Sequence, residues 1–368
     1  MTSTSVGNSV GNPIGDLANP LATTLTTLTL PRPDDWHLHL RDGPELAAVV
    51  GHTARVFGRA IVMPNLSPPV TTVAAARSYR DRILAALPAK ARFEPLMTLY
   101  LTDNTPPAEI AEAKTSGIVH AVKYYPAGAT TNSDSGVTSL DRVYPVLAAM
   151  ERHGMVLSLH GEVTAPEVDM FDREQVFVDT LLPRIVRDFP ALKVVLEHIT
   201  TKEATAFVLE HARNVAATIT PQHLLFSRNA LFTENFLRPH HYCLPILKRE
   251  SHRQALVAAA TSGDARFFLG TDSAPHAKHK KESACGCAGC YTAHAALEMY
   301  AEAFEDAGAL NRLEVFASRH GAQFYGLPQH QDTLTLRREA WTVPSGYAFG
   351  GDTIVPLRAG EVLRWRVS

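Results

Sequence analysis

Several short apolar runs in this chain stop abruptly at a residue that can bind a metal ion. One run ends at His160, another at His198, and a third reaches Asp272 through Gly-Thr. The runs have the length and composition of buried strands. Because the carboxyl ends of parallel strands converge on one face of an α/β barrel, such side chains can meet although they are far apart in the sequence.

Eight apolar runs alternate with segments whose apolar residues recur at helical spacing. This alternation predicts an α/β chain folded as a (β/α)8 TIM barrel. The expected strands lie near 35–39, 60–64, 93–101, 118–124, 155–160, 193–198, 214–219 and 266–271. The expected helices lie near 44–57, 71–87, 106–116, 139–153, 172–189, 201–211, 249–262 and 291–307.

The chain shows no internal repeat and no linker that would divide it into domains. Residues 1–27 are rich in Ser, Thr, Asn and Gly and are expected to be a flexible tail. Residues 28–368 are expected to form a single (β/α)8 barrel domain. Within it, residues 331–368 are expected to add short β extensions on the outside.

Composition excludes several classes of partner. The net charge of −2 gives no electrostatic reason to expect nucleic acid or an anionic membrane. No apolar stretch approaches the roughly 18 residues that span a bilayer, and residues 1–27 lack the basic start and apolar centre of an export signal. A small-molecule substrate and a cytoplasmic location are therefore expected.

Three of the four cysteines are crowded together as Cys285, Cys287 and Cys290. They do not resemble a secreted disulfide framework, which favours a reducing compartment. A structural zinc site needs four ligands, and the remaining cysteine, Cys243, is more than forty residues away. Free thiols in a loop are therefore preferred to a zinc knuckle, and the role of the triplet stays open.

The residues at the strand ends form a plausible set of metal ligands. His37 and His39 are two apart, so both imidazoles point to the same side of a strand. His160, His198 and Asp272 would join them from other strands. Imidazole and carboxylate suit Zn²⁺ or a similar divalent ion. Taken singly, each of these residues could instead be a structural residue at a strand end.

Lys123 ends the fourth apolar run and does not suit a metal site as an ammonium, because a dication would repel it. It could instead pair with an acidic neighbour. Alternatively, carboxylation by CO₂ would convert its amine into an anionic carbamate that bridges two metal ions. Four histidines, one aspartate and one carbamate would supply enough ligands for two zinc ions lying roughly 3.5–4 Å apart.

From about residue 30 onward, the chain resembles the dihydroorotases, in the shorter, separately encoded bacterial type within the amidohydrolase superfamily. Together these motifs are highly specific, whereas His-x-His alone is weak. The resemblance rests on Asp34-Asp-Trp-His-Leu-His-Leu-Arg-Asp-Gly43, Val62-Met-Pro-Asn65, Lys123-Tyr-Tyr-Pro-Ala127, His160-Gly-Glu162, Glu197-His-Ile-Thr-Thr201 and Gly270-Thr-Asp-Ser-Ala-Pro-His276.

The resemblance implies a ligand set for two zinc ions. His37 and His39 would hold the more buried ion with Asp272, while His160 and His198 would hold the more exposed one. Carboxylated Lys123 and a hydroxide would bridge the pair. The resemblance also implies a substrate-binding set, namely Arg41, Asn65 and His276 on the substrate carboxylate, His160, and the backbone near Leu244 and Ala288.

The implied reaction is the reversible cyclisation of N-carbamoyl-L-aspartate to L-dihydroorotate plus water, the third step of de novo pyrimidine biosynthesis. In the hydrolytic direction the bridging hydroxide would attack the ring carbonyl, with Asp272 as general acid and base. Thr130 and Thr131 would belong to a mobile lid over the substrate. The resemblance also implies a homodimer.

Other classes stay open at this point. A dihydropyrimidinase, hydantoinase or allantoinase would use the same metal core without needing the Arg41, Asn65 and His276 group. A mononuclear deaminase on the same type of barrel would not need a carboxylated lysine. A non-catalytic dihydroorotase-like scaffold should have lost ligands, and here none is missing.

Overall fold

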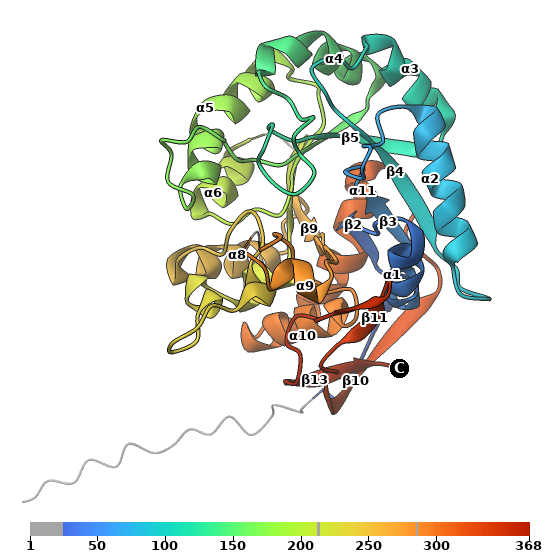
Figure 1. Ribbon diagram of the computed structural model, residues 1–368, viewed down its shortest axis with the longest axis vertical. Coiled ribbons are helices and arrows are strands. Elements are labelled where there is room, and N and C mark those ends of the chain that lie inside the picture. The colour runs from blue at the N-terminus through green and yellow to red at the C-terminus, as the bar shows by residue number, and fades with distance from the viewer. Residues whose placement is uncertain (1–24, 212–213, 285) are drawn as a thin grey trace, which may run out of the picture.

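Eight parallel strands form the centre of the molecule in a computed structural model that describes residues 25–211, 214–284 and 286–368 (Figure 1). Their spatial order follows their chain order. The strands are β2 (Asp34–Leu38), β3 (Arg59–Val62), β4 (Glu94–Tyr100), β5 (Val119–Tyr124), β6 (Val156–Leu159), β7 (Val194–Leu196), β8 (Val215–Ile219) and β9 (Phe267–Leu269). Each lies within about two residues of its predicted position.

Backbone contacts between the first and last strands of this sheet bring its two edges together. The His39 amide donates to the Ser273 carbonyl at 3.1 Å, and the Asp272 amide donates to the His37 carbonyl at 2.9 Å. Leu38 and Ser273 form a parallel bridge just beyond the two strands. The predicted eight-stranded α/β barrel is therefore confirmed, and its seam passes through the expected metal ligands.

Helices surround the barrel and connect successive strands (Figure 1). The principal ones are α1 (Gly43–Val56), α2 (Val73–Ala86), α3 (Pro107–Ser116), α4 (Leu140–His153), α5 (Arg173–Asp188), α6 (Lys202–Glu210), α8 (Glu250–Thr261) and α10 (Ala296–Asp306). Shorter helices are α7 (Pro221–Leu225), α9 (Lys278–Lys281) and α11 (His320–Tyr325). None of the helices in the described part of the chain is long and apolar enough to cross a membrane.

The helix expected from residue 291 begins only at Ala296. The hydroxyl of Ser273 accepts hydrogen bonds from the amides of Thr292 and Ala293, at 3.1 and 3.0 Å. The Tyr291 carbonyl, which a helix starting at residue 291 would pair with the amide of residue 295, instead accepts from the Leu357 amide at 2.9 Å. The segment is therefore held at the seam of the barrel instead of being helical.

The barrel interior and the layer between strands and helices are separate apolar clusters. At the amino-terminal end of the barrel, Trp36 stacks on Tyr325 of α11 with ring centroids 4.6 Å apart. Gly321 permits this contact, because a Cβ atom there would lie 2.0 Å from the Trp36 indole nitrogen. α11 therefore closes the end opposite the strand ends that carry the ligands.

A second sheet lies outside the barrel near the carboxyl terminus (Figure 1). Its three antiparallel strands are β1 (Thr27–Pro31), β10 (Thr333–Thr342) and β13 (Val362–Val367). A separate two-stranded sheet consists of β11 (Tyr347–Phe349) and β12 (Asp352–Ile354). The predicted β extensions after residue 331 are thus present, with β1 as an added strand. Most of the expected tail, residues 1–24, lies outside the described residues.

Candidate metal centre and substrate pocket

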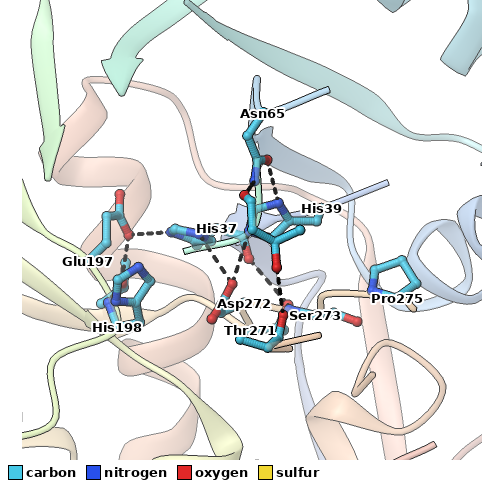
Figure 2. Close-up of polar contacts among 12 residues, drawn as sticks. His37, His39, Asn65, Glu197, His198, Thr271, Asp272, Ser273 and Pro275 are labelled. Carbon is cyan, nitrogen blue, oxygen red and sulfur yellow. Dashed lines mark hydrogen bonds and ion pairs between the residues drawn. The ribbon is translucent and has the colours of Figure 1, made fainter. Parts of the chain in front are cut away.

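Three predicted ligands meet at the seam of the barrel. The Nε2 atoms of His37 and His39 lie 3.4 and 3.1 Å from Asp272 Oδ1. One ligand atom from each of the three residues lies within 4.8 Å of the others, and all three residues are buried. Figure 2 shows the three side chains pointing toward one another: His37 lies on β2, His39 directly follows it, and Asp272 lies in the segment after β9. Their donor set and spacing suit a divalent cation.

Each of the two histidines is oriented by a partner on its other ring nitrogen (Figure 2). His37 Nδ1 lies 3.0 Å from Glu197 Oε2, and His39 Nδ1 lies 2.8 Å from Asn65 Oδ1. Such outer contacts fix the ring orientation of metal-binding histidines. Glu197 is itself held by the hydroxyls of Ser158 and Thr218, each at 2.6 Å. The Nε2 atoms are thereby directed toward Asp272.

Asp35 ties the two strands of the seam together. Its carboxylate accepts from the His37 amide at 3.1 Å, and from the Thr271 amide and hydroxyl at 2.9 and 2.6 Å. Gly270 allows this close approach, because a Cβ atom there would lie 2.7 Å from Thr218 Cβ and 3.1 Å from His37 Cβ. The distance between His37 and Asp272 is therefore set by their neighbours.

His160 and His198, the other two histidines expected to be ligands, lie beside the first group. The His198 ring centroid is 4.8 Å from those of both His37 and His160. His160 Nε2 contacts Glu162 Oε2 at 2.7 Å, while His198 Nδ1 is buried without a hydrogen-bond partner among the described residues. A buried imidazole nitrogen without a hydrogen-bond partner is available to bind a metal ion.

Lys123 is fully buried on β5, and its Nζ atom has no hydrogen-bond partner among the described residues. Burial lowers the pKa of Lys123 to about 8 and raises the pKa of Glu197 to about 7, so the neutral form of each group is more accessible than it would be in water. The amine also lies 5.1 Å from the Tyr125 ring centroid. A buried, unpaired amine is costly. Such an amine beside four imidazoles and a carboxylate fits a group that completes a metal cage.

Three site residues have left-handed backbone conformations. The φ angles are 62° at Arg41, 41° at His198 and 44° at Asp272. Non-glycine residues in this region cost about 1 kcal/mol or more each, and they cluster at functional sites where the surroundings hold them. Each of these residues lies two or three positions beyond the end of a strand, where the chain turns sharply into a loop.

Arg41 and His276 come together near the metal ligands. Arg41 Nη2 lies 2.9 Å from His276 Nε2, and Arg41 Nε donates to the Pro275 carbonyl at 2.9 Å. The hydroxyl of Tyr79 donates to the Arg41 carbonyl at 2.6 Å and holds the left-handed turn. Asn65, the third residue of the predicted carboxylate site, instead spans His39 and the Thr131 carbonyl, to which it donates at 3.1 Å.

The predicted lid residues cover this group. The Thr131 hydroxyl contacts the Ala288 carbonyl at 3.5 Å, and the Asn132 amide donates to the Asn65 carbonyl at 3.0 Å. Together these contacts hold the segment over the mouth of the barrel. The cavity beneath it is lined by His37, His39, Arg41, Asn65, Tyr125, Thr130, Thr131, His160, His198, Leu244, Asp272, Ala274, Ala288 and Gly289. Eleven of the predicted site residues line this cavity. His276 contacts one of them, Arg41. Lys123 is fully buried and is not among the lining residues.

The cysteines form no metal-binding cluster in the described part of the chain. Cys243 and Cys290 are buried free thiols that contact each other, and Cys287 is partly exposed. Cys285 lies outside the described residues. Cys243 is more than forty residues from the triplet in sequence but lies against Cys290 in space. Its sulfur also lies 3.7 Å from His223 Nε2, but these side chains are not part of a three-ligand group among the described residues.

Sequence reasoning did not assign roles to three buried carboxylates beside the ligands. Glu197 orients His37, and Glu162 contacts His160. Glu174 accepts hydrogen bonds from the amides and hydroxyls of Thr200 and Thr201, just after His198. Glu197 and Glu162 lie within two residues of predicted histidines, a signal that was available. Glu174 lies on α5, far in sequence from Thr200 and Thr201, so only the tertiary structure reveals its role.

Comparison with known proteins agrees with this site. The model of the amidohydrolase family matches residues 34–362. The dihydroorotase of Laribacter hongkongensis is 66% identical over 93% of this chain and 99% of its own length. The crystal structure of dihydroorotase from Saccharomyces cerevisiae in complex with 5-fluoroorotic acid superposes with a TM-score of 0.86, at 32% identity, over 94% of this chain and 99% of its own.

A hydantoinase from Arthrobacter aurescens shares the fold at a TM-score of 0.73, covering 92% of this chain and 87% of its own, but with only 14% identity. That likeness concerns architecture alone. The high identity over almost the full length, together with the ligands assembled at the barrel seam, shows that the chain belongs to the dihydroorotases of the amidohydrolase family.

Proposed function

We propose that this dihydroorotase interconverts N-carbamoyl-L-aspartate and L-dihydroorotate at the cavity under the lid, using two zinc ions. The observation that carries the proposal is the meeting of His37, His39 and Asp272 within 4.8 Å of one another, beside the buried and unpaired amine of Lys123. An imidazole and carboxylate cluster of this kind has the composition of a hydrolytic zinc site.

His37, His39 and Asp272 would hold one ion, and His160 and His198 the other, with carboxylated Lys123 between them. Carboxylation joins the neutral Lys123 amine to CO₂ through a new N–C bond and releases one proton. Bound there, the two zinc ions would activate water and polarise the carbonyl that is attacked. The unpaired Lys123 Nζ and His198 Nδ1 atoms support this assignment, because each lacks a partner within the described protein.

Asp272 is the residue we propose as general acid and base. Its carboxylate faces the cavity beside His37 and His39 and is 5% exposed. In hydrolysis it would take the proton of the attacking water and deliver it to the ring nitrogen as the amide C–N bond breaks. In cyclisation it would accept the proton from the ureido nitrogen, as microscopic reversibility requires.

Arg41 and His276 would bind the carboxylate of the substrate. A guanidinium can donate two parallel hydrogen bonds to a carboxylate. Arg41 Nη2 and His276 Nε2 are 2.9 Å apart and hydrogen-bonded to each other, so a carboxylate that replaced this bond could contact both side chains. Asn65 would connect this site to the lid through its contact with Thr131.

This arrangement predicts a clear substrate preference. The purified, zinc-loaded protein should hydrolyse L-dihydroorotate, and its turnover of dihydrouracil and hydantoin should be at least about a hundredfold slower, because neither supplies a carboxylate to Arg41. Ultraviolet assays with the three compounds and metal analysis of the same sample provide the test. Equal rates on all three would favour a broad cyclic-amide hydrolase, and no activity with full metal content would favour a scaffold.

The lid contacts predict an effect on turnover without an effect on metal. Replacing both Thr130 and Thr131 with Ala should lower kcat roughly 10- to 100-fold, because the substrate loses closure and positioning. Zinc content should match the wild type, since neither residue is a proposed ligand. Ser135→Ala, an exposed position in the same segment, is the matched control. Wild-type kcat in the double variant would dismiss the lid role.

We also propose that the protein acts as a homodimer in the cytoplasm, as its relatedness to the dihydroorotases implies. Sedimentation of the purified chain measures the first part of this proposal.

A further inference from the structure

Lys281 is the last residue of α9, and its side chain is turned into the protein while its neighbours in the basic run Lys278–Lys280 are exposed. It is 3% exposed. Its Nζ atom donates to the carbonyls of Tyr242 at 2.8 Å, Cys287 at 2.7 Å and Gly289 at 2.8 Å. An ammonium has three N–H donors, so every one of them is used on backbone oxygen.

The three carbonyls belong to two segments that are far apart in sequence and adjacent in space. One segment, residues 242–245, contains Leu244, and the other, residues 286–290, contains Ala288; both residues line the cavity. The Gly289 amide also donates to the Tyr242 carbonyl at 3.0 Å. Lys281 is therefore the side chain that joins these two walls of the substrate cavity through a single atom.

The three hydrogen bonds of Lys281, called the clamp below, also restrain Ala288, the residue that the lid contacts. Cys287 and Gly289, whose carbonyls bind Lys281, flank Ala288, whose own carbonyl contacts the Thr131 hydroxyl at 3.5 Å. His276 also hydrogen-bonds to the Ala288 backbone. Fixing the carbonyls on both sides leaves the peptide group of Ala288 little freedom to rotate. Its orientation toward the cavity and the lid then depends on Lys281.

The charge of Lys281 has no acidic partner among the residues that the structure describes. Burying an ammonium costs free energy that three carbonyl contacts offset only in part. An apolar side chain at this position would leave the carbonyls of Tyr242, Cys287 and Gly289 without this donor. The three bonds of the ammonium therefore fix the carbonyl geometry at the cavity wall.

We infer that Lys281 is a positioning residue for the proposed dihydroorotase reaction, which orients the backbone at Leu244 and Ala288 toward the amide groups of the substrate ring and toward the lid. The inference rests on the proposed function of this cavity. Lys281 itself does not touch the reacting atoms. Its loss should therefore weaken substrate binding more than it slows the chemical step.

The test uses the full-length, zinc-loaded protein and the variant Lys281→Met, which keeps the aliphatic stem and removes the ammonium. KM for L-dihydroorotate should rise about tenfold or more, the effect of losing at least one effective hydrogen bond, while kcat falls by a smaller factor. Zinc content should stay at the wild-type level. Lys193→Met is the control, because Lys193 donates to a single carbonyl, that of Phe324, at the opposite end of the barrel.

Hydrogen exchange supplies a readout that does not depend on activity. In Lys281→Met the amide of Gly289 should exchange at least about tenfold faster, whereas amides of β5 should be unchanged. Unchanged KM and unchanged exchange would overturn the inference, and so would an activity loss matched by zinc loss. An inactive wild type would instead refute the proposed function, while the exchange result would still report on the clamp.

A second variant covers the case in which Lys281→Met does not fold. Lys281→Gln offers two N–H donors on a shorter side chain, so it should fold with part of the clamp intact. Its KM and its Gly289 exchange rate should lie between those of the wild type and the values expected for complete loss. Wild-type values of both in Lys281→Gln would also overturn the inference.

Discussion

Lys123→Ala should lower dihydroorotate turnover by at least about a thousandfold, because several kcal/mol of metal-derived stabilisation would be lost with the bridging group. Lys123 is fully buried and its amine contacts no hydrogen-bond acceptor in the described chain, so its removal breaks no visible structural bond. Zinc content should fall together with activity. Steady-state kinetics and metal analysis on the same preparation give the measurement.

Acetate or propionate should restore part of the activity of Lys123→Ala, since a small carboxylate can occupy the space of the carbamate. Native mass spectrometry of the wild type should detect the added CO₂ on Lys123. Lys114→Ala, which removes an exposed lysine of α3, should behave as the wild type. Full activity of Lys123→Ala without any additive would refute the paired-metal assignment.

Asp272→Asn should reduce kcat by about 10² to 10⁴, the usual contribution of a positioned acid or base. Asparagine has nearly the same shape and is among the residues that tolerate a left-handed backbone, so the φ of 44° is no obstacle. Its amide oxygen can still face His37 and His39, but it cannot carry the proton. Most of the zinc should therefore remain bound.

Comparing kcat with zinc content separates the two roles of Asp272. A loss of kcat with zinc retained supports proton transfer, whereas equal losses of both would reduce Asp272 to a ligand. Asp141→Asn, an exposed aspartate of α4 that pairs with Arg184, is the control and should leave both quantities unchanged. Wild-type kcat in Asp272→Asn would contradict the role of Asp272 in proton transfer.

The barrel could be predicted because its signals are local. Most of the barrel strands are runs of apolar residues buried on both faces, and the helices between them carry apolar residues at helical spacing. The one clear boundary error, at Ala296, reflects bonds to distant residues: Leu357 donates to the Tyr291 carbonyl, and Ser273 accepts from the amides of Thr292 and Ala293. A contact of that kind leaves no trace in the periodicity of the segment it shapes.

The six proposed ligands could be named because they occupy equivalent places, at or just beyond strand ends on one face. Their outer contacts could not all be read in the same way. Glu174 reaches Thr200 and Thr201 from another helix, and Asn65 faces both His39 and the lid instead of standing only at the carboxylate site. These partners depend on how loops fold over the barrel mouth.

By itself, the sequence determined the order of strands and helices, the face on which the ligands gather and the family to which the chain is related. Only the tertiary structure decided that Cys243 lies against Cys290, that Asp35 locks the seam beside Asp272, and that the lysine ending an apparently solvated basic run is buried. The physical reason is that strand and helix periodicity follows from neighbours along the chain. Burial and pairing across a closed barrel follow instead from the register of all eight strands and from loops that meet only after closure.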